Sequence, residues 1–110
     1  ELYLAFLELT DNLELYGVTC GLNIRLNKSV PAVAVMEMFD TFEKMIELSL
    51  DNLSAVNISV TLNEGIFTMT VTAESSTDFN VMNGDFVTAV CDDDGEWQIV
   101  YRREAKRCKA

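Results

Sequence analysis

The fold is decided by one stretch, residues 31–73, which reads PAVAVMEMFDTFEKMIELSLDNLSAVNISVTLNEGIFTMTVTA. Pro31 suits the start of a helix, because its missing N–H falls in the first turn, where backbone donors lack partners. Apolar side chains then recur at steps of three, four and seven residues, as they do on one helix face: Val35, Phe39, Phe42, Ile46 and Leu53. Charged residues mark the opposite face of this predicted helix: Glu37, Asp40, Glu43, Lys44, Glu47 and Asp51.

After residue 52 the apolar period changes from helical to two, which is typical of strands. Two alternating segments, residues 56–62 and 67–73, flank the turn Asn63-Glu64-Gly65, in which Gly65 can adopt a positive φ. The helix and the hairpin each have one apolar face. We therefore expect the helix to pack on the hairpin, since this removes both faces from water.

The rest of the chain predicts further elements of the same kinds. Residues 1–16 read as a helix and 18–26 as a strand; 74–85 form a polar break. A second hairpin joins residues 86–91 and 96–102 through the acidic turn Asp92-Asp93-Asp94-Gly95. We predict an α+β fold, a two-layer sandwich of a mixed, mostly antiparallel sheet of about five strands with two helices on one face.

We expect a single domain over residues 1–110, with a core at 17–101 and a solvated basic tail at 102–110. The chain begins with Glu1, so it is expected to be a piece of a longer protein. Apolar residues cover more than one side of the first helix. This suggests a second partner for that helix, either an upstream segment or another copy of the chain.

Composition excludes several classes of function. The net charge of −10 argues against nucleic acid, whose phosphates must be met by Lys and Arg. Apolar runs are shorter than the ~18 residues of a membrane helix, so we expect no membrane contact. The chain has three cysteines and no histidine, so it lacks the four Cys or His ligands of a structural zinc site and cannot use histidine in catalysis. Free thiols are typical of a cytoplasmic protein.

The order helix, acidic break, strand, turn, strand resembles the ATP-binding domain of bacterial sensor histidine kinases, a GHKL (HATPase-like) family. That family has a helical Glu, an Asn four residues later that holds magnesium, and a hairpin ending in Asp-x-Gly. Glu43 matches the Glu, whereas Glu47 stands at the Asn position. At the Asp-x-Gly position the chain reads Ala73-Glu74-Ser75-Ser76, and the following break has one glycine, where the family has Gly-rich boxes and a lid.

The resemblance implies that Glu43 is the catalytic carboxylate and that Glu47 and Glu74 lie at the cofactor site. A Glu at the Asn position would repel a triphosphate, by about 4 kcal/mol at ~4 Å and an effective dielectric constant of ~20. We therefore expect a degenerate domain, one that keeps the fold but has lost the nucleotide site. It would bind no cofactor or metal of its own.

Three hypotheses remain open. The first is a degenerate domain of a bacterial two-component sensor that docks to its own dimerisation helices or to a response regulator. The second is an active, divergent histidine kinase that uses ATP and magnesium, with Glu43 catalytic and Glu47 and Glu74 holding the metal. The third is an unrelated α+β domain that binds a small ligand or a protein; in that case Glu43 is one more acid on a solvated helix face.

Overall fold

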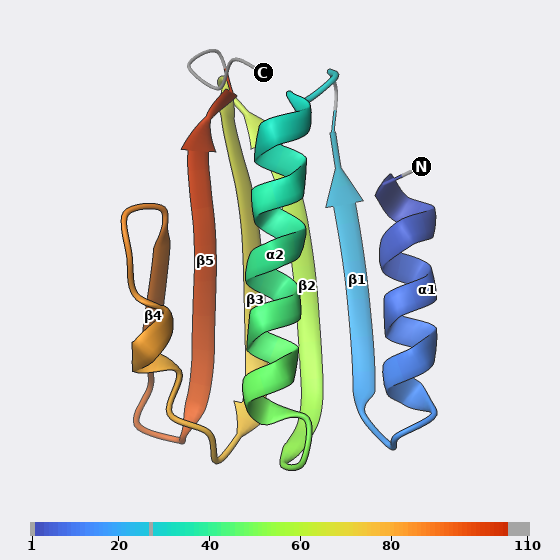
Figure 1. Cartoon of the computed structure of the whole chain (residues 1–110), viewed down its shortest axis with the longest axis vertical. Coiled ribbons are helices and arrows are strands. Elements are labelled where there is room, and N and C mark those ends of the chain that lie inside the picture. The colour runs from blue at the N-terminus through green and yellow to red at the C-terminus, as the bar shows by residue number, and fades with distance from the viewer. Residues whose placement is uncertain (1, 27, 106–110) are drawn as a thin grey trace.

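The computed structural model of the chain describes residues 2–26 and 28–105. Its elements, in chain order, are helix α1 (Leu2–Glu14), strand β1 (Thr19–Arg25), helix α2 (Ala32–Ser49), strands β2 (Leu53–Asn63) and β3 (Ile66–Ser75), a short 3₁₀ turn η1 (Phe79–Met82), and strands β4 (Val87–Cys91) and β5 (Glu96–Glu104). Figure 1 shows α2 in front of the middle of the sheet, running along its strands, and α1 beside β1.

The sheet has five strands in the order β1-β2-β3-β5-β4. β1 pairs with β2 in parallel, and the other neighbours are antiparallel. The predicted α+β architecture, with a mixed and mostly antiparallel sheet, is confirmed. Because β1 and β2 are parallel, the chain must cross from one end of the sheet to the other between them, and α2 is that crossover.

The two predicted turns are present. Glu64 and Gly65 have φ of 52° and 79°, as a two-residue hairpin loop between β2 and β3 requires. In the second turn, the Asp92 carboxylate accepts hydrogen bonds from the backbone N–H groups of Asp94 and Glu96, both at 2.9 Å. The acidic turn is thus held by its own side chain.

The apolar face of α2 differs from the predicted one. The buried side chains are Ala34, Met38, Phe42, Met45 and Ser49, whereas Val35, Phe39 and Ile46 are half-buried. Leu53 belongs to β2, since the helix ends at Ser49. The reason is that α2 has two apolar neighbours: one flank meets the sheet and the next meets α1, so the apolar surface is wider than one stripe.

Helix α1 packs beside α2 through aromatic contacts. The Phe6 ring stacks on Phe39, with ring centroids 4.7 Å apart, and meets Phe42 edge-on at 5.6 Å. These contacts place both helices in one layer on the same face of the sheet (Figure 1). The side of α1 that faces neither α2 nor β1 remains in solvent: Leu4 is 66% exposed and Tyr3 50%.

Strand β5 continues past its predicted end at residue 102 into residues 103 and 104, which belong to the predicted basic tail. The strand continues because these residues pair with β3, Arg103 opposite Phe67 and Glu104 opposite Ile66. The rest of the predicted tail, residues 106–110, lies outside the described residues.

Neither helix in the described part of the chain has the length and apolar character needed to cross a bilayer.

The outer edge of β4 is covered by the residues just before it. The Asn83 side chain donates to the Ala89 carbonyl at 3.3 Å and accepts from the Ala89 N–H at 2.8 Å. The Gly84 N–H also donates to the Val87 carbonyl at 2.9 Å. These bonds occupy groups that an edge strand would otherwise offer to another chain.

Replacing Asn83 should therefore weaken this end of the sheet. We expect Asn83→Ala to lower the free energy of unfolding by about 1–2 kcal/mol, because two backbone groups of Ala89 lose their partner. Asn83→Asp keeps the acceptor for the Ala89 N–H and should lose less. Urea unfolding followed by circular dichroism measures both, and equal stability of Asn83→Ala and the parent chain would contradict this role.

Candidate functional site

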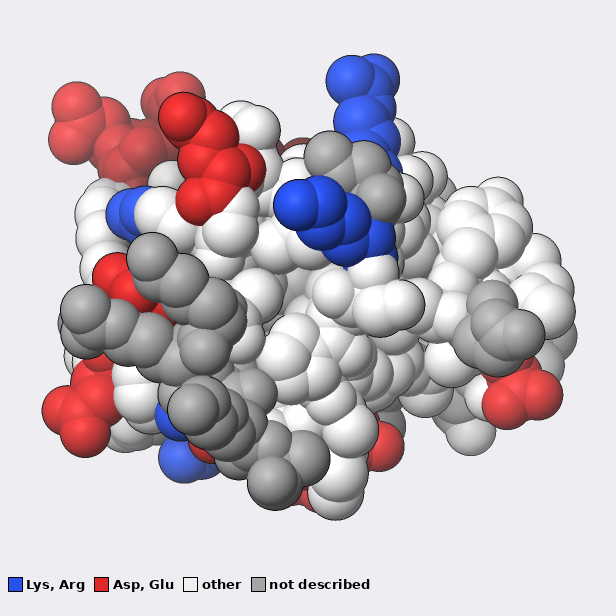
Figure 2. Space-filling model, turned by 90° about the horizontal axis from the view of Figure 1, so that it is seen from above, with Lys and Arg blue, Asp and Glu red and all other residues white. Residues whose placement is uncertain are grey.

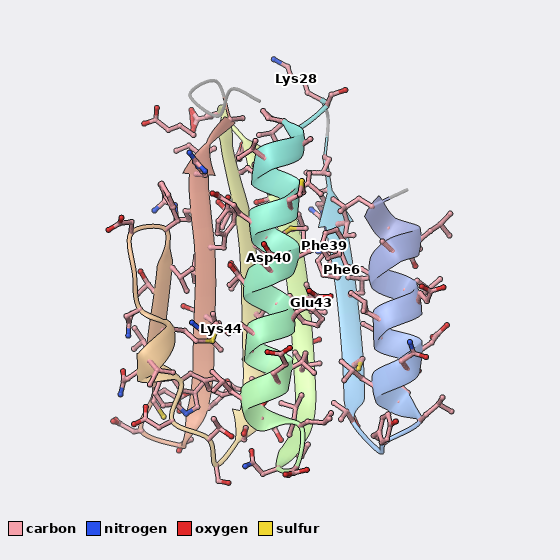
Figure 3. The ribbon with its side chains drawn as sticks, in the orientation of Figure 1. Phe6, Lys28, Phe39, Asp40, Glu43 and Lys44 are labelled. Atoms are coloured by element: carbon pink, nitrogen blue, oxygen red, sulfur yellow. The ribbon has the colours of Figure 1, made fainter. Side chains whose placement is uncertain are left out.

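The residues implicated by the resemblance lie in two separate hollows. Glu43 and Glu47 are exposed, one turn apart on α2, and line a hollow of about 340 Å³ between the second halves of α1 and α2. Its other walls are mainly apolar, with Leu9, Tyr16, Phe42, Ile46 and Leu50 among them. Figure 3 shows Glu43 on the side of α2 that faces β1 and α1, and Lys44 on the side of β5.

Glu74 lies at the end of β3, in a different hollow of about 440 Å³. Three further carboxylates line that hollow, from Asp92, Asp94 and Glu96, and none of the lining residues that the structure describes is Lys or Arg. The structure thus brings Glu43 and Glu47 together and leaves Glu74 elsewhere. An acidic hollow without bases disfavours a phosphate group, because like charges repel at short range.

No metal centre is formed within residues 2–26 and 28–105. No group of three or more Asp, Glu, Cys or His side chains there lies close enough to hold an ion. Two adjacent carboxylates on an exposed helix, such as Glu43 and Glu47, repel each other weakly.

Where the Asp-x-Gly motif is expected, the chain carries a small hydrogen-bonded network. The Thr77 hydroxyl donates to the Asn52 side-chain oxygen at 2.7 Å, and Ser75 donates to the same oxygen. The Ser75 hydroxyl in turn accepts from the Thr77 N–H at 3.0 Å. This network connects the end of β3 to the turn between α2 and β2. Sequence reasoning missed it, since three scattered hydroxyl and amide residues give no pattern.

The segment after β3, which the resemblance assigns to the nucleotide lid, is packed into the core. Phe79 of η1 is fully buried and meets Trp97 edge-on, with ring centroids 5.5 Å apart. Met82 is 6% exposed. The Asp78 carboxylate accepts from the Asn80 N–H at 2.9 Å and so begins the turn. The segment therefore contributes buried side chains to the core beside β4 and β5.

The fold is similar to that of histidine kinase catalytic domains. One solved structure, the catalytic domain of histidine kinase ThkA in a nucleotide-free form, matches with a TM-score of 0.61 and 3% identity, over 94% of this chain and 89% of that chain. A second nucleotide-free form of the same domain matches with a TM-score of 0.56 and 4% identity, over 94% and 88%. No family model matches the sequence, and no curated protein matches it significantly. At such identity the likeness shows the histidine-kinase-like fold alone.

Neither of the two described cysteines forms a disulfide. Burial raises the pKa of the Cys20 thiol, and the nearby acids Glu14 and Asp11 raise it further. A thiol with a raised pKa is a poor nucleophile at neutral pH. Cys91 is exposed, and Cys108 lies outside the described residues.

One polar contact that sequence reasoning missed joins α2 to β5. Glu37, assigned above to the solvated face, accepts hydrogen bonds from the Tyr101 hydroxyl at 2.7 Å and from the Arg103 guanidinium. The Arg103 guanidinium also lies 4.4 Å from the centre of the Phe86 ring. The hydrogen bonds from Arg103 and Tyr101, in that order, lower the pKa of the Glu37 carboxyl.

This contact predicts a pH dependence of stability. The folded-state pKa of Glu37 is below its unfolded value of about 4.3, so the contribution is complete above that value and is lost as pH falls through the folded pKa. The Glu37 side chain is 39% exposed, which screens the pair. We therefore expect Glu37→Gln to cost about 0.5–1 kcal/mol at pH 7. The difference from the parent chain should shrink in acid.

The matched control is Asp40→Asn, which removes a charge from an exposed position of the same helix. Chemical denaturation at a series of pH values measures both variants. If the two variants lost the same stability at every pH, the role of the Glu37 contact would be refuted.

Proposed function

We propose that this chain is a degenerate histidine-kinase-like ATPase domain of a bacterial sensor protein in a two-component system. It would act in the cytoplasm as an interaction or regulatory module, with weak or no ATP binding. Its partners would be proteins, namely its own dimerisation helices or a response regulator. The likeness of the fold to histidine kinase catalytic domains supports the family part of this proposal.

One observation carries the loss of nucleotide binding. The three residues implicated by the resemblance are divided between two hollows, with Glu43 and Glu47 facing α1 and Glu74 among other acids at the end of β3. A nucleotide site needs its carboxylate, its metal ligands and its phosphate-binding backbone in one place. Among residues 2–26 and 28–105, no Lys or Arg lines either hollow.

The buried η1 segment supports the same proposal. A phosphate cradle needs several backbone N–H groups brought close by glycines. Between β3 and β4 the chain has a single glycine, Gly84, and its N–H already donates to the Val87 carbonyl. With Phe79 buried in the core, closing this segment over a ligand would first require breaking its contact with Trp97.

The proposal predicts that nucleotides do not stabilise the domain. We expect ATP or ADP, with and without magnesium, to raise the melting temperature by less than about 1 °C at millimolar concentration, because a ligand that does not bind the folded state cannot stabilise it. Differential scanning fluorimetry measures this, with magnesium alone as the control for ionic effects.

A shift of several degrees at micromolar nucleotide would overturn the degenerate assignment and favour an active kinase domain. In that case Glu43→Gln in the full-length parent protein should abolish autophosphorylation. Unchanged autophosphorylation in Glu43→Gln would exclude Glu43 as the catalytic carboxylate.

A further inference from the structure

A long groove follows the boundary between α1 and α2. It consists of two hollows, which lie on either side of the Phe6–Phe39 stack and which we call together the groove; Figure 3 shows Phe6 and Phe39 between the two helices. The lower hollow, of about 340 Å³, is the one lined by Glu43 and Glu47. The upper hollow, of about 480 Å³, is lined by Leu2, Ala5, Val30, Val35 and Phe39, with Lys28 at its end. The groove therefore extends along most of both helices.

Both walls of the groove are apolar stripes at helical spacing. On α1 and the turn that follows it, Leu2, Leu9 and Tyr16 are seven residues apart and so lie on one flank. The α2 wall is formed by Val35, Phe39, Ile46 and Leu50. Part of this surface is in water: Tyr16 is 74% exposed and Leu50 45%.

Figure 2 shows the upper end of the molecule and separates charged residues from all others. Uncharged side chains make up most of the surface on the side where α1 lies, and acidic side chains appear at its margin (Figure 2). Apolar walls with a charged rim are typical of a surface that binds another protein.

Charge indicates which partner the groove accepts. The lower end carries two carboxylates, and the chain as a whole has a net charge of −10. A second copy of the chain carries the same net charge of −10, so two copies repel each other as they approach. Such a pairing is disfavoured by repulsion, whereas a basic partner gains at the same end.

We propose that the groove binds an amphipathic α-helix of another protein, with apolar anchors for the two hollows and Lys or Arg side chains next to Glu43 and Glu47. Val35 and Ile46 mark the two hollows and are eleven residues apart, or about 16 Å at 1.5 Å per residue. The two anchors of the partner helix therefore lie about eleven residues apart. This proposal rests on the proposed function, which it deepens by naming the chemistry of the partner.

The direction of the partner helix also follows. The positive end of a helix dipole is its N-terminus, which is favoured near the carboxylates of Glu43 and Glu47. Its C-terminus then lies near Lys28, at the upper end of the groove. Since α1 and α2 both run from the upper to the lower end, the bound helix is antiparallel to both (Figure 1).

The test uses a fluorescein-labelled synthetic helix of about 18 residues. It carries Leu anchors about eleven residues apart and Lys near its N-terminus, and a second peptide has Glu in place of every Lys. Fluorescence anisotropy at about 0.1 M salt measures binding to the whole chain. We expect the Lys peptide to bind with a micromolar Kd and the Glu peptide at least about tenfold more weakly.

Matched variants separate the groove from general attraction between opposite charges. Glu43→Gln with Glu47→Gln should weaken binding of the Lys peptide by about tenfold. Glu8→Gln with Asp11→Gln removes the same charge from exposed positions of α1 that line neither hollow, and should change the Kd by less than about threefold. Equal weakening by the two pairs would refute the proposal.

The apolar wall has its own pair of variants. Leu50→Ser should weaken binding, because Leu50 lines the lower hollow. Leu15→Ser is the control, since Leu15 is 82% exposed and lines neither hollow. Circular dichroism checks that each variant is folded.

Three other outcomes would overturn the proposal. One is absence of binding by the Lys peptide, and another is a dimer in analytical ultracentrifugation that Leu50→Ser dissolves, which would assign the groove to a second copy. Equal affinity for the Lys and Glu peptides is the third. Nucleotide binding in the fluorimetry experiment would refute the degenerate site but leave these peptide results unchanged, so the two failures are distinguishable.

Discussion

Burial of α2 against the central hairpin is the constraint on which the rest of the structure depends. Met38, Phe42 and Met45 meet a sheet face whose central side chains on β2 and β3 are 0–2% exposed: Val56, Ile58, Val60, Phe67, Met69 and Val71. Burying one such side chain contributes about 1.5–3 kcal/mol. The parallel pairing of β1 with β2 requires a crossover between them, so the same helix that closes the core also connects these two strands.

The two flanks of α2 then have different neighbours. On one flank, Phe39 stacks on Phe6 of α1, and Glu43 and Glu47 follow on the same side at the edge of the groove. On the other flank, Glu37 is hydrogen-bonded to Tyr101 and Arg103 of β5. The orientation of the helix thus separates acids that are equivalent in the sequence: one forms a structural contact, and two line a groove.

Under the proposed function, this arrangement would allow a histidine-kinase-like fold to be kept while its nucleotide site is lost. The fold depends on the buried faces of α2 and the sheet, whereas the nucleotide site that the resemblance implies would depend in part on residues at the end of β3 and in the segment after it. Here that segment contributes Phe79 and Met82 to the core, and the end of β3 is fastened by Asn52, Ser75 and Thr77. The groove between α1 and α2 remains as an open apolar surface, bordered by charge.

The sequence by itself determined the order and type of the elements, the two hairpin turns and the α+β class. These features depend on local properties: apolar period, the positive φ of Gly65 and the capping carboxylate of Asp92. The tertiary structure alone decided which flank of α2 meets which neighbour, and that Glu74 lies apart from Glu43 and Glu47. It also placed Gly21 next to Asn57 of β2, so that a Cβ at residue 21 would lie 1.9 Å from the Asn57 side-chain oxygen and would require that side chain to move. The physical reason is geometric. Local sequence fixes only the angle between successive side chains around the helix, about 100° per residue. The neighbouring elements decide how the whole helix is rotated, and therefore which side chain meets which partner.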